Sequence, residues 1–173
     1  MRYRIKLGIS SVALSLCSAL WASEGTDGVR TQLLADDLAV VQAGEKIYQI
    51  HCAACHGKYL EGQPDWRKRD ANGYLPAPPH DATGHTWHHA DDLLFEITKY
   101  GPSVVINDPE YKTIMPVYEG ILTDEDIIAV LSYIKNSWPA DERDWQESVN
   151  GTQVNGIQDV PKKKSSFLEK LLK

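Results

Sequence analysis

The chain has 173 residues, of which 42% are hydrophobic and 24% are charged, a composition typical of a globular protein with one ordinary domain. Its formal net charge of −6 argues against a nucleic-acid-binding function, because such proteins need a basic face to neutralise phosphates. No P-loop, dinucleotide-binding glycine motif or internal repeat occurs in the sequence.

The N-terminus has the pattern of a secretory signal. Three basic residues precede an apolar stretch at residues 7–20, and Ala22 offers a small-residue cleavage site. Because this stretch is shorter than the roughly 20 residues that span a membrane, we favour a signal peptide over an uncleaved anchor for residues 1–22. Export to the periplasm is therefore expected, and removal of the three basic residues would leave a formal charge of −9.

Residues 23–36 are expected to form a flexible leader, and a helix is predicted from Asp37 to Cys55. Apolar residues recur there near helical spacing, and the aspartate at its start suits the N-cap position. Frequent glycine and proline predict a loop over residues 57–89. A second helix is predicted over residues 90–100, with a glycine directly after it as the stop signal, and a second loop is predicted over residues 102–121.

The last predicted helix runs from Asp124 to about Ser137 and ends before Pro139. Thr123 suits its N-cap, and Asp126 completes a variant of the capping box. Its apolar face is formed by Ile127, Val130, Leu131 and Ile134. Residues 140–173 are expected to form a flexible basic tail, whose weakly amphipathic end suits a peripheral contact with a membrane surface.

The predicted helices and long loops leave a small core for a folded domain over residues 37–139. A polypeptide core of this size is marginal by itself, and long structureless loops are uncommon in compact domains. A large apolar cofactor, with the loops wrapped around it, would supply the missing core.

The cysteines Cys52 and Cys55 are followed directly by His56. The third cysteine, Cys17, lies in the segment to be removed, and a disulfide between the other two would close too short a loop to stabilise the chain much. Cys-x-x-Cys-His is the attachment pattern of c-type haem, in which both thiols form thioethers with the porphyrin and the histidine ligates the iron. A thioredoxin-like dithiol and a zinc site completed by further histidines are the alternatives.

A second axial ligand is needed if the iron is to carry electrons. Apart from the initiator, Met115 is the only methionine, and it precedes Pro116 in the loop before the last helix. A thioether opposite a histidine favours ferrous iron and raises the reduction potential. The alternatives are that Met115 fills the core, or that His88 or His89 ligates the iron in its place.

These motifs resemble those of the bacterial, exported class I monohaem c-type cytochromes over residues 37–139. The matching residues outside the cysteine motif are Gly44, Tyr48, Met115, Pro116, Val130 and Tyr133. The resemblance implies an all-α cytochrome c fold, with three to five short helices wrapped around one covalently attached haem c. It also implies that the first and last helices cross at nearly right angles, with Gly44 permitting close contact and Tyr48 packing on the last helix.

The loop at residues 75–89 is longer and richer in histidine than the minimal core of that family. His85 and Trp87 are candidates for hydrogen bonds to the haem propionates, and a packing role for the loop is the alternative. Copper binding by the histidines is a further hypothesis.

The sequence thus predicts a periplasmic one-electron carrier, not an enzyme, with Cys52, Cys55, His56 and Met115 binding the haem and the last two ligating its iron. Its donor and acceptor would be redox proteins, among them a membrane-bound respiratory complex, and its acidity would favour a partner with a basic patch. Two alternatives stay open: a haem peroxidase or ligand sensor with a displaceable Met115, and a cytochrome subunit of a larger oxidoreductase.

Overall fold

The computed structural model describes residues 31–154. The predicted signal peptide, residues 23–30 of the predicted leader and residues 155–173 of the predicted tail lie outside the described residues.

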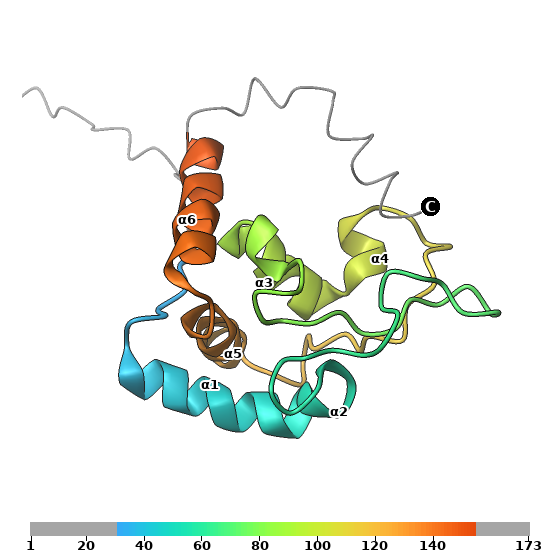
Figure 1. The fold of residues 1–173 in the computed structure, drawn as a ribbon, viewed down its shortest axis with the longest axis horizontal. Helices are drawn as coiled ribbons and strands as arrows, with labels where there is room; N and C mark the ends of the chain where they lie inside the picture. Colours follow the sequence, from blue (N-terminus) through green and yellow to red (C-terminus); the bar gives the residue numbers. More distant parts are fainter. Residues whose placement is uncertain (1–30, 155–173) are drawn as a thin grey trace, which may run out of the picture.

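Within residues 31–154 the fold consists of helices and loops, and no β-strand is present. Its elements in chain order are α1 (Leu38–His51), α2 (Ala53–His56), the 3-10 helix η1 (Thr86–His88), α3 (Asp91–Tyr100), α4 (Pro102–Val105), α5 (Asp124–Asn136) and α6 (Ala140–Val154). In Figure 1, α1 lies along the lower edge, α5 is seen nearly end-on beside it, and α6 continues upward from α5. The predicted all-α fold is confirmed. No helix in the described part is both long and apolar enough to cross a membrane.

The helix ends follow the capping signals of the sequence. The Asp37 carboxylate accepts hydrogen bonds from two backbone N–H groups in the first turn of α1. Thr123 and Asp126 form a reciprocal capping box at the start of α5, and Gly101, with φ of 85°, ends α3. These predictions are confirmed. Asp37 and Thr123 bind N–H groups that the first turn of a helix leaves unpaired, and Gly101 adopts a backbone conformation that favours glycine.

Two boundaries differ from the prediction. The helix expected from Asp37 to Cys55 divides at Cys52 into α1 and α2, although Cys52 still donates its N–H to the Tyr48 carbonyl. The expected loop after Gly101 opens with the short helix α4, whose first residue is Pro102. A proline at the first helical position lacks only an N–H group that would be unpaired in any case, and its fixed φ suits a helix.

The closest helix contact is the crossing of α1 and α5 at Gly44. A Cβ atom on Gly44 would lie 1.9 Å from the Ala129 carbonyl oxygen and 3.0 Å from the Tyr133 Cβ, so only glycine allows the two backbones to meet. One turn further on, the rings of Tyr48 and Tyr133 pack with centroids 5.4 Å apart. The close contact and the Tyr48 packing implied by the family resemblance are therefore present.

The hydrophobic core lies mainly between α1, α3 and α5. Its buried members are Leu33, Tyr48, Leu60, Leu94, Ile127, Val130, Leu131, Ile134 and Trp138. All four residues of the predicted apolar face of α5 are among them, which confirms that prediction. Leu60 lies in a loop and Leu33 lies in the segment before α1, so the core also contains residues from outside the helices.

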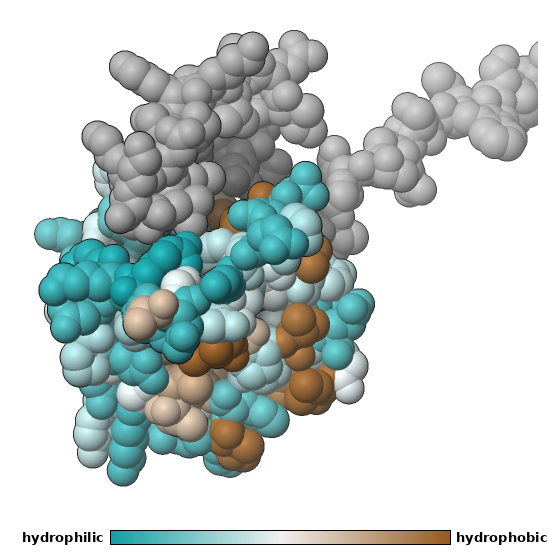
Figure 2. Space-filling model, turned by 90° about the vertical axis from the view of Figure 1, so that its right-hand side faces the viewer, coloured by the Kyte–Doolittle hydropathy of each residue, from teal (hydrophilic) through white to brown (hydrophobic). Residues whose placement is uncertain are grey.

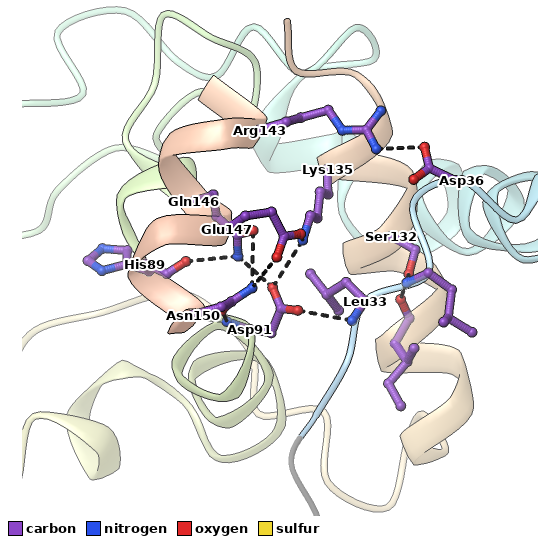
Figure 3. A network of polar contacts seen from close by, with 12 residues as sticks. Leu33, Asp36, His89, Asp91, Ser132, Lys135, Arg143, Gln146, Glu147 and Asn150 are labelled. Atoms are coloured by element: carbon purple, nitrogen blue, oxygen red, sulfur yellow. Dashed lines mark hydrogen bonds and ion pairs between the residues drawn. The ribbon is translucent and has the colours of Figure 1, made fainter. Parts of the chain in front are cut away.

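The predictions of a flexible leader and a flexible tail are wrong at their inner ends. Residues 31–36 pack on the domain and bury Leu33, and residues 140–154 form α6, in which Gln146 is fully buried. Asp91, the first residue of α3, connects both segments: its carboxylate accepts hydrogen bonds from the Leu33 N–H, at 3.0 Å, and from the Gln146 side-chain amide (Figure 3).

Ion pairs complete this network (Figure 3). The ammonium group of Lys135, itself buried on α5, lies 3.7 Å from Asp91 and also pairs with Glu147 on α6. Arg143 on α6 binds Asp36 of the N-terminal segment at 2.6 Å. Both segments are thus attached largely by polar side chains, and hydrophobic periodicity, the main sequence signal for a packed element, is weak in them.

Candidate functional site

The cysteine motif lies where α1 meets α2 (Figure 1). Cys52 is the residue between the two helices, and Cys55 and His56 belong to α2. Both thiols are free, Cys52 partly buried and Cys55 exposed. The His56 N–H donates to the Cys52 carbonyl at 2.9 Å, so one helical turn of backbone holds the three residues together, which suits attachment to one porphyrin edge.

The environment of Cys52 does not suit a redox-active dithiol. Burial, and then the neighbouring Cys55, raise the pKa of Cys52 to about 11, so its thiol is protonated at neutral pH. A thioredoxin-like site needs a cysteine with a lowered pKa, because the thiolate is the nucleophile. The thioredoxin alternative is therefore disfavoured.

The His56 side chain is held with one ring nitrogen available. Its Nδ1 lies 2.9 Å from the Pro78 carbonyl oxygen. Because a carbonyl oxygen can only accept, Nδ1 carries the hydrogen and Nε2 keeps its lone pair. Burial lowers the pKa of His56, against a smaller opposing effect of the Pro78 hydrogen bond, so the imidazole is neutral at neutral pH. A neutral imidazole with its second nitrogen bonded to a carbonyl is the usual state of a metal-ligating histidine.

The chain directly after His56 is also fixed. Gly57 ends α2 with φ of 84°, a conformation that favours glycine, and a Cβ there would overlap the Glu61 carboxylate. The Gly57 carbonyl accepts a hydrogen bond from the Tyr48 hydroxyl at 2.9 Å. The core tyrosine of the α1–α5 crossing thus also positions the turn that carries His56.

Tyr118 joins the loop of Met115 to the cysteine motif. Tyr118 is buried, and its hydroxyl donates a 2.6 Å hydrogen bond to the carbonyl of His51, the residue before Cys52. Burial raises the pKa of Tyr118 to about 12, with smaller contributions from Cys52 and Cys55. Met115 itself is partly buried, three residues before Tyr118. The structure therefore brings the Met115 loop to the cysteine motif, and ligation by Met115 stays a prediction.

Several apolar side chains near Met115 and around α4 are exposed. They include Val104 on α4, Ile106 directly after it, and Ile114 and Val117 on either side of Met115. Figure 2 shows separate hydrophobic patches within a hydrophilic surface on the face that includes the loops at the right of Figure 1. A porphyrin face would cover apolar groups of this kind, so the donor set and its surroundings fit a haem.

His80 contacts His56, and the sequence did not predict this contact. The two rings are stacked, with centroids 4.0 Å apart and planes 21° apart. Burial, and then the proximity of His56, hold the pKa of His80 well below its ordinary value, so this ring is also neutral. A histidine within a proline-rich loop gave no sign of this contact, because the path of the loop decides it.

The other histidines of this loop form a separate aromatic cluster. The rings of His85 and His88 lie 5.0 Å apart, and His88 stacks on Trp87 at 3.7 Å. The Trp87 indole N–H donates to the Ala82 carbonyl at 3.3 Å, which favours a packing role for Trp87 over propionate binding, and propionate binding by His85 stays a prediction. Among the described residues, no group of three or more His, Cys, Asp or Glu side chains is placed to hold a metal ion.

A comparison with protein families matches residues 41–138 to the cytochrome c family. No curated protein and no solved structure matches the chain. The matched span begins in α1, ends just after α5 and includes the cysteine motif and Met115, whereas α6 and the packed N-terminal segment lie outside it. The chain therefore belongs to the cytochrome c family, whose members generally carry electrons on a covalently bound haem and are not enzymes.

Proposed function

We propose that this protein is a periplasmic one-electron carrier with a single haem c, attached through Cys52 and Cys55 and ligated by His56 and Met115. The observation that carries the proposal is the state of His56: its Nδ1 is bonded to the Pro78 carbonyl, which leaves Nε2 available beside two free thiols. When bound, the haem supplies an iron atom that alternates between the ferric and ferrous states.

The two proposed ligands act on the reduction potential in opposite directions. The hydrogen bond from His56 to Pro78 makes the imidazole a stronger donor, which stabilises ferric iron. The thioether of Met115 favours ferrous iron and raises the potential. The pair suits reversible transfer of one electron, because neither oxidation state is strongly favoured by both ligands.

A site with both axial positions occupied leaves no coordination position for peroxide or a gas. That closed coordination favours electron transfer over the peroxidase and sensor alternatives. No described observation favours either alternative specifically. The tie between Tyr118 and His51 holds the Met115 loop against the cysteine motif, which would resist displacement of the methionine.

The location and partners belong to the same proposal. The N-terminal signal pattern supports export to the periplasm, with its cleavage giving an acidic protein. An acidic carrier is attracted to a basic patch on its redox partners, a membrane-bound respiratory complex among them. The basic end of the tail adds a peripheral contact with the membrane surface.

Carbon monoxide binding tests the closed site. The ferrous holoprotein should not bind carbon monoxide at neutral pH, whereas Met115→Ala should keep the covalent haem and bind it stoichiometrically. Ile114→Ala, a change in the adjacent exposed residue, should behave like the wild type. Rapid stoichiometric binding by the wild type would contradict Met115 ligation and favour the sensor or peroxidase. If Met115→Ala stays closed and His88→Ala or His89→Ala opens, a loop histidine is the ligand.

A further inference from the structure

His80 occupies one face of the His56 imidazole. The two rings are stacked at 4.0 Å, and the ring of Tyr48 meets His80 edge-on, with centroids 6.4 Å apart and planes 73° apart. Tyr48 is fully buried in the core at the α1–α5 crossing. His80 therefore contacts both the proposed iron ligand and a buried residue of the core.

The backbone of His80 is held on both sides. Its N–H donates to the Leu60 carbonyl at 2.8 Å, and its carbonyl accepts a 2.8 Å hydrogen bond from the indole N–H of Trp138. Leu60 and Trp138 are both buried in the core. These contacts fix the backbone of His80 relative to the segment directly after α5 and to the loop that follows His56.

The ring of His80 is fixed as well. Its Nδ1 is hydrogen-bonded to the Thr86 hydroxyl at 2.8 Å, and Thr86, the first residue of η1, is buried. The backbone of His80 is held, its ring is hydrogen-bonded, and the ring of Tyr48 packs nearby, so the His80 ring has little rotational freedom. It offers His56 a flat, immobile surface, which an aliphatic side chain would not provide.

The Pro78 hydrogen bond alone does not define the plane of the His56 ring. A single bond to Nδ1 still permits the ring to tilt about the line from Cβ to the acceptor, whereas stacking against His80 opposes that tilt. In a low-spin ferric haem, the plane of an axial imidazole decides how unpaired spin is distributed over the porphyrin. Ligand orientation also influences the relative stability of the two oxidation states.

We propose that His80 is a positioning residue, which sets the plane of the His56 imidazole and through it the spin distribution and reduction potential of the haem. The inference rests on the proposed function, because it requires His56 to ligate the iron. The role follows from the stacked geometry and the fixed surroundings of His80.

The test compares three variants of the full-length holoprotein. His80→Leu removes the flat ring, His80→Phe keeps a ring but not the hydrogen bond, and Thr86→Val keeps the histidine but frees it to rotate. The matched control is His88→Leu, which removes a ring that stacks on Trp87 in the same loop. Covalent haem is first checked by absorption and intact mass. The readouts are the haem-methyl proton shifts of the oxidised protein and the midpoint potential.

His80→Leu should change the pattern of methyl shifts severalfold more than His88→Leu does and should shift the midpoint potential. Thr86→Val and His80→Phe each keep a ring at position 80 but lose its hydrogen bond, so both should change the two readouts in the same direction as His80→Leu and by less. If His80→Leu does not accumulate with haem, the inference is tested by Thr86→Val and His80→Phe. Their methyl shifts and midpoint potentials are then compared with those of the His88→Leu control.

Wild-type methyl shifts and potential in haem-loaded His80→Leu or Thr86→Val would overturn the inference, as would equal changes in the His88→Leu control. These results leave the proposed function intact. A wild-type protein without covalent haem would instead refute the proposed function itself.

Discussion

Gly44 is the residue on which the α1–α5 crossing depends most directly. Gly44→Ala would place a methyl group 1.9 Å from the Ala129 carbonyl oxygen, so the helices must separate. We expect a loss of about 3 kcal/mol or more in the free energy of unfolding, because backbone atoms cannot move aside as a flexible side chain does. Denaturant unfolding of the holoprotein measures it.

The matched control is Gly151→Ala in α6. A Cβ there would meet nothing within 4 Å, so this change should alter stability by less than about 1 kcal/mol, in the stabilising direction. Equal stability of Gly44→Ala and the wild type would show that the two helices do not meet as closely as described.

Tyr118 offers a second residue-level prediction. Tyr118→Phe removes the 2.6 Å hydrogen bond to His51 and leaves that carbonyl without this donor, which should cost about 1 kcal/mol of stability. Because the bond ties the Met115 loop to the cysteine motif, added imidazole should displace the methionine more readily. Titration of the ferric protein with imidazole measures this, and Tyr59→Phe, at a side chain that is 75% exposed, should titrate like the wild type. Unchanged imidazole affinity in Tyr118→Phe would contradict the proposed tie.

At this scale the sequence identifies the residues with distinctive chemistry and misses the groups that support them. Cys52, Cys55 and His56 follow from their spacing alone. The acceptor for His56 is the backbone carbonyl of Pro78, and every residue has such a carbonyl, so no sequence pattern marks it. The contact of His80 depends likewise on how a long loop returns to α2.

At the scale of elements, α6 is attached to the domain through the buried side chain of Gln146. Its amide donates to the Asp91 carboxylate and to the His89 carbonyl. Gln146→Leu removes both donors while keeping a side chain of similar size, so we expect a loss of about 2 kcal/mol in unfolding free energy. Gln42→Leu, the same change at an exposed position of α1, is the control and should be nearly neutral. Equal stability of the two variants would contradict the packing of α6.

The pair between Glu147 and Lys135 predicts a pH dependence. Burial raises the pKa of Glu147, but the hydrogen bond and charge of Lys135 outweigh this effect, so the pKa lies below its ordinary value of 4.5. The carboxylate therefore stabilises the fold above that pH, and its contribution is lost as the pH falls through the lowered pKa. Glu147→Gln should be less stable than the wild type at neutral pH by under about 1 kcal/mol, since the side chain is largely exposed.

Unfolding midpoints across the acidic range check this sign. The gap between the two proteins should close as the pH drops below the ordinary glutamate pKa. A gap that widens in acid would mean that Lys135 is not the dominant partner of this carboxylate.

Helices that begin and end at capping residues could be predicted from the sequence. α6, which depends on tertiary contacts, could not. Asp37, Gly101 and Thr123 mark helix ends because each has a specific chemical task there. α6 has a polar composition with weak hydrophobic periodicity, and it is fixed by contacts to Asp91, more than fifty residues away. Only the tertiary fold brings those groups together, so the sequence favoured a flexible tail.

For the whole molecule, the formal charge of −6 gives a prediction about association. Electron transfer to a partner with a basic patch should slow as ionic strength rises, because salt screens the attraction that brings the proteins together. Stopped-flow oxidation of the reduced protein by such a partner, at increasing salt, measures the effect. A rate that is independent of salt or rises with it would contradict docking through the acidic surface.

For the whole molecule, the central claim is that this chain carries one haem covalently on its cysteine motif. The most direct measurement is the intact mass of the denatured, purified protein, made in cells able to mature c-type cytochromes. We predict the polypeptide mass plus one haem, and the polypeptide mass alone for the Cys52→Ala, Cys55→Ala double variant. A wild-type mass equal to that of the bare polypeptide would contradict the account.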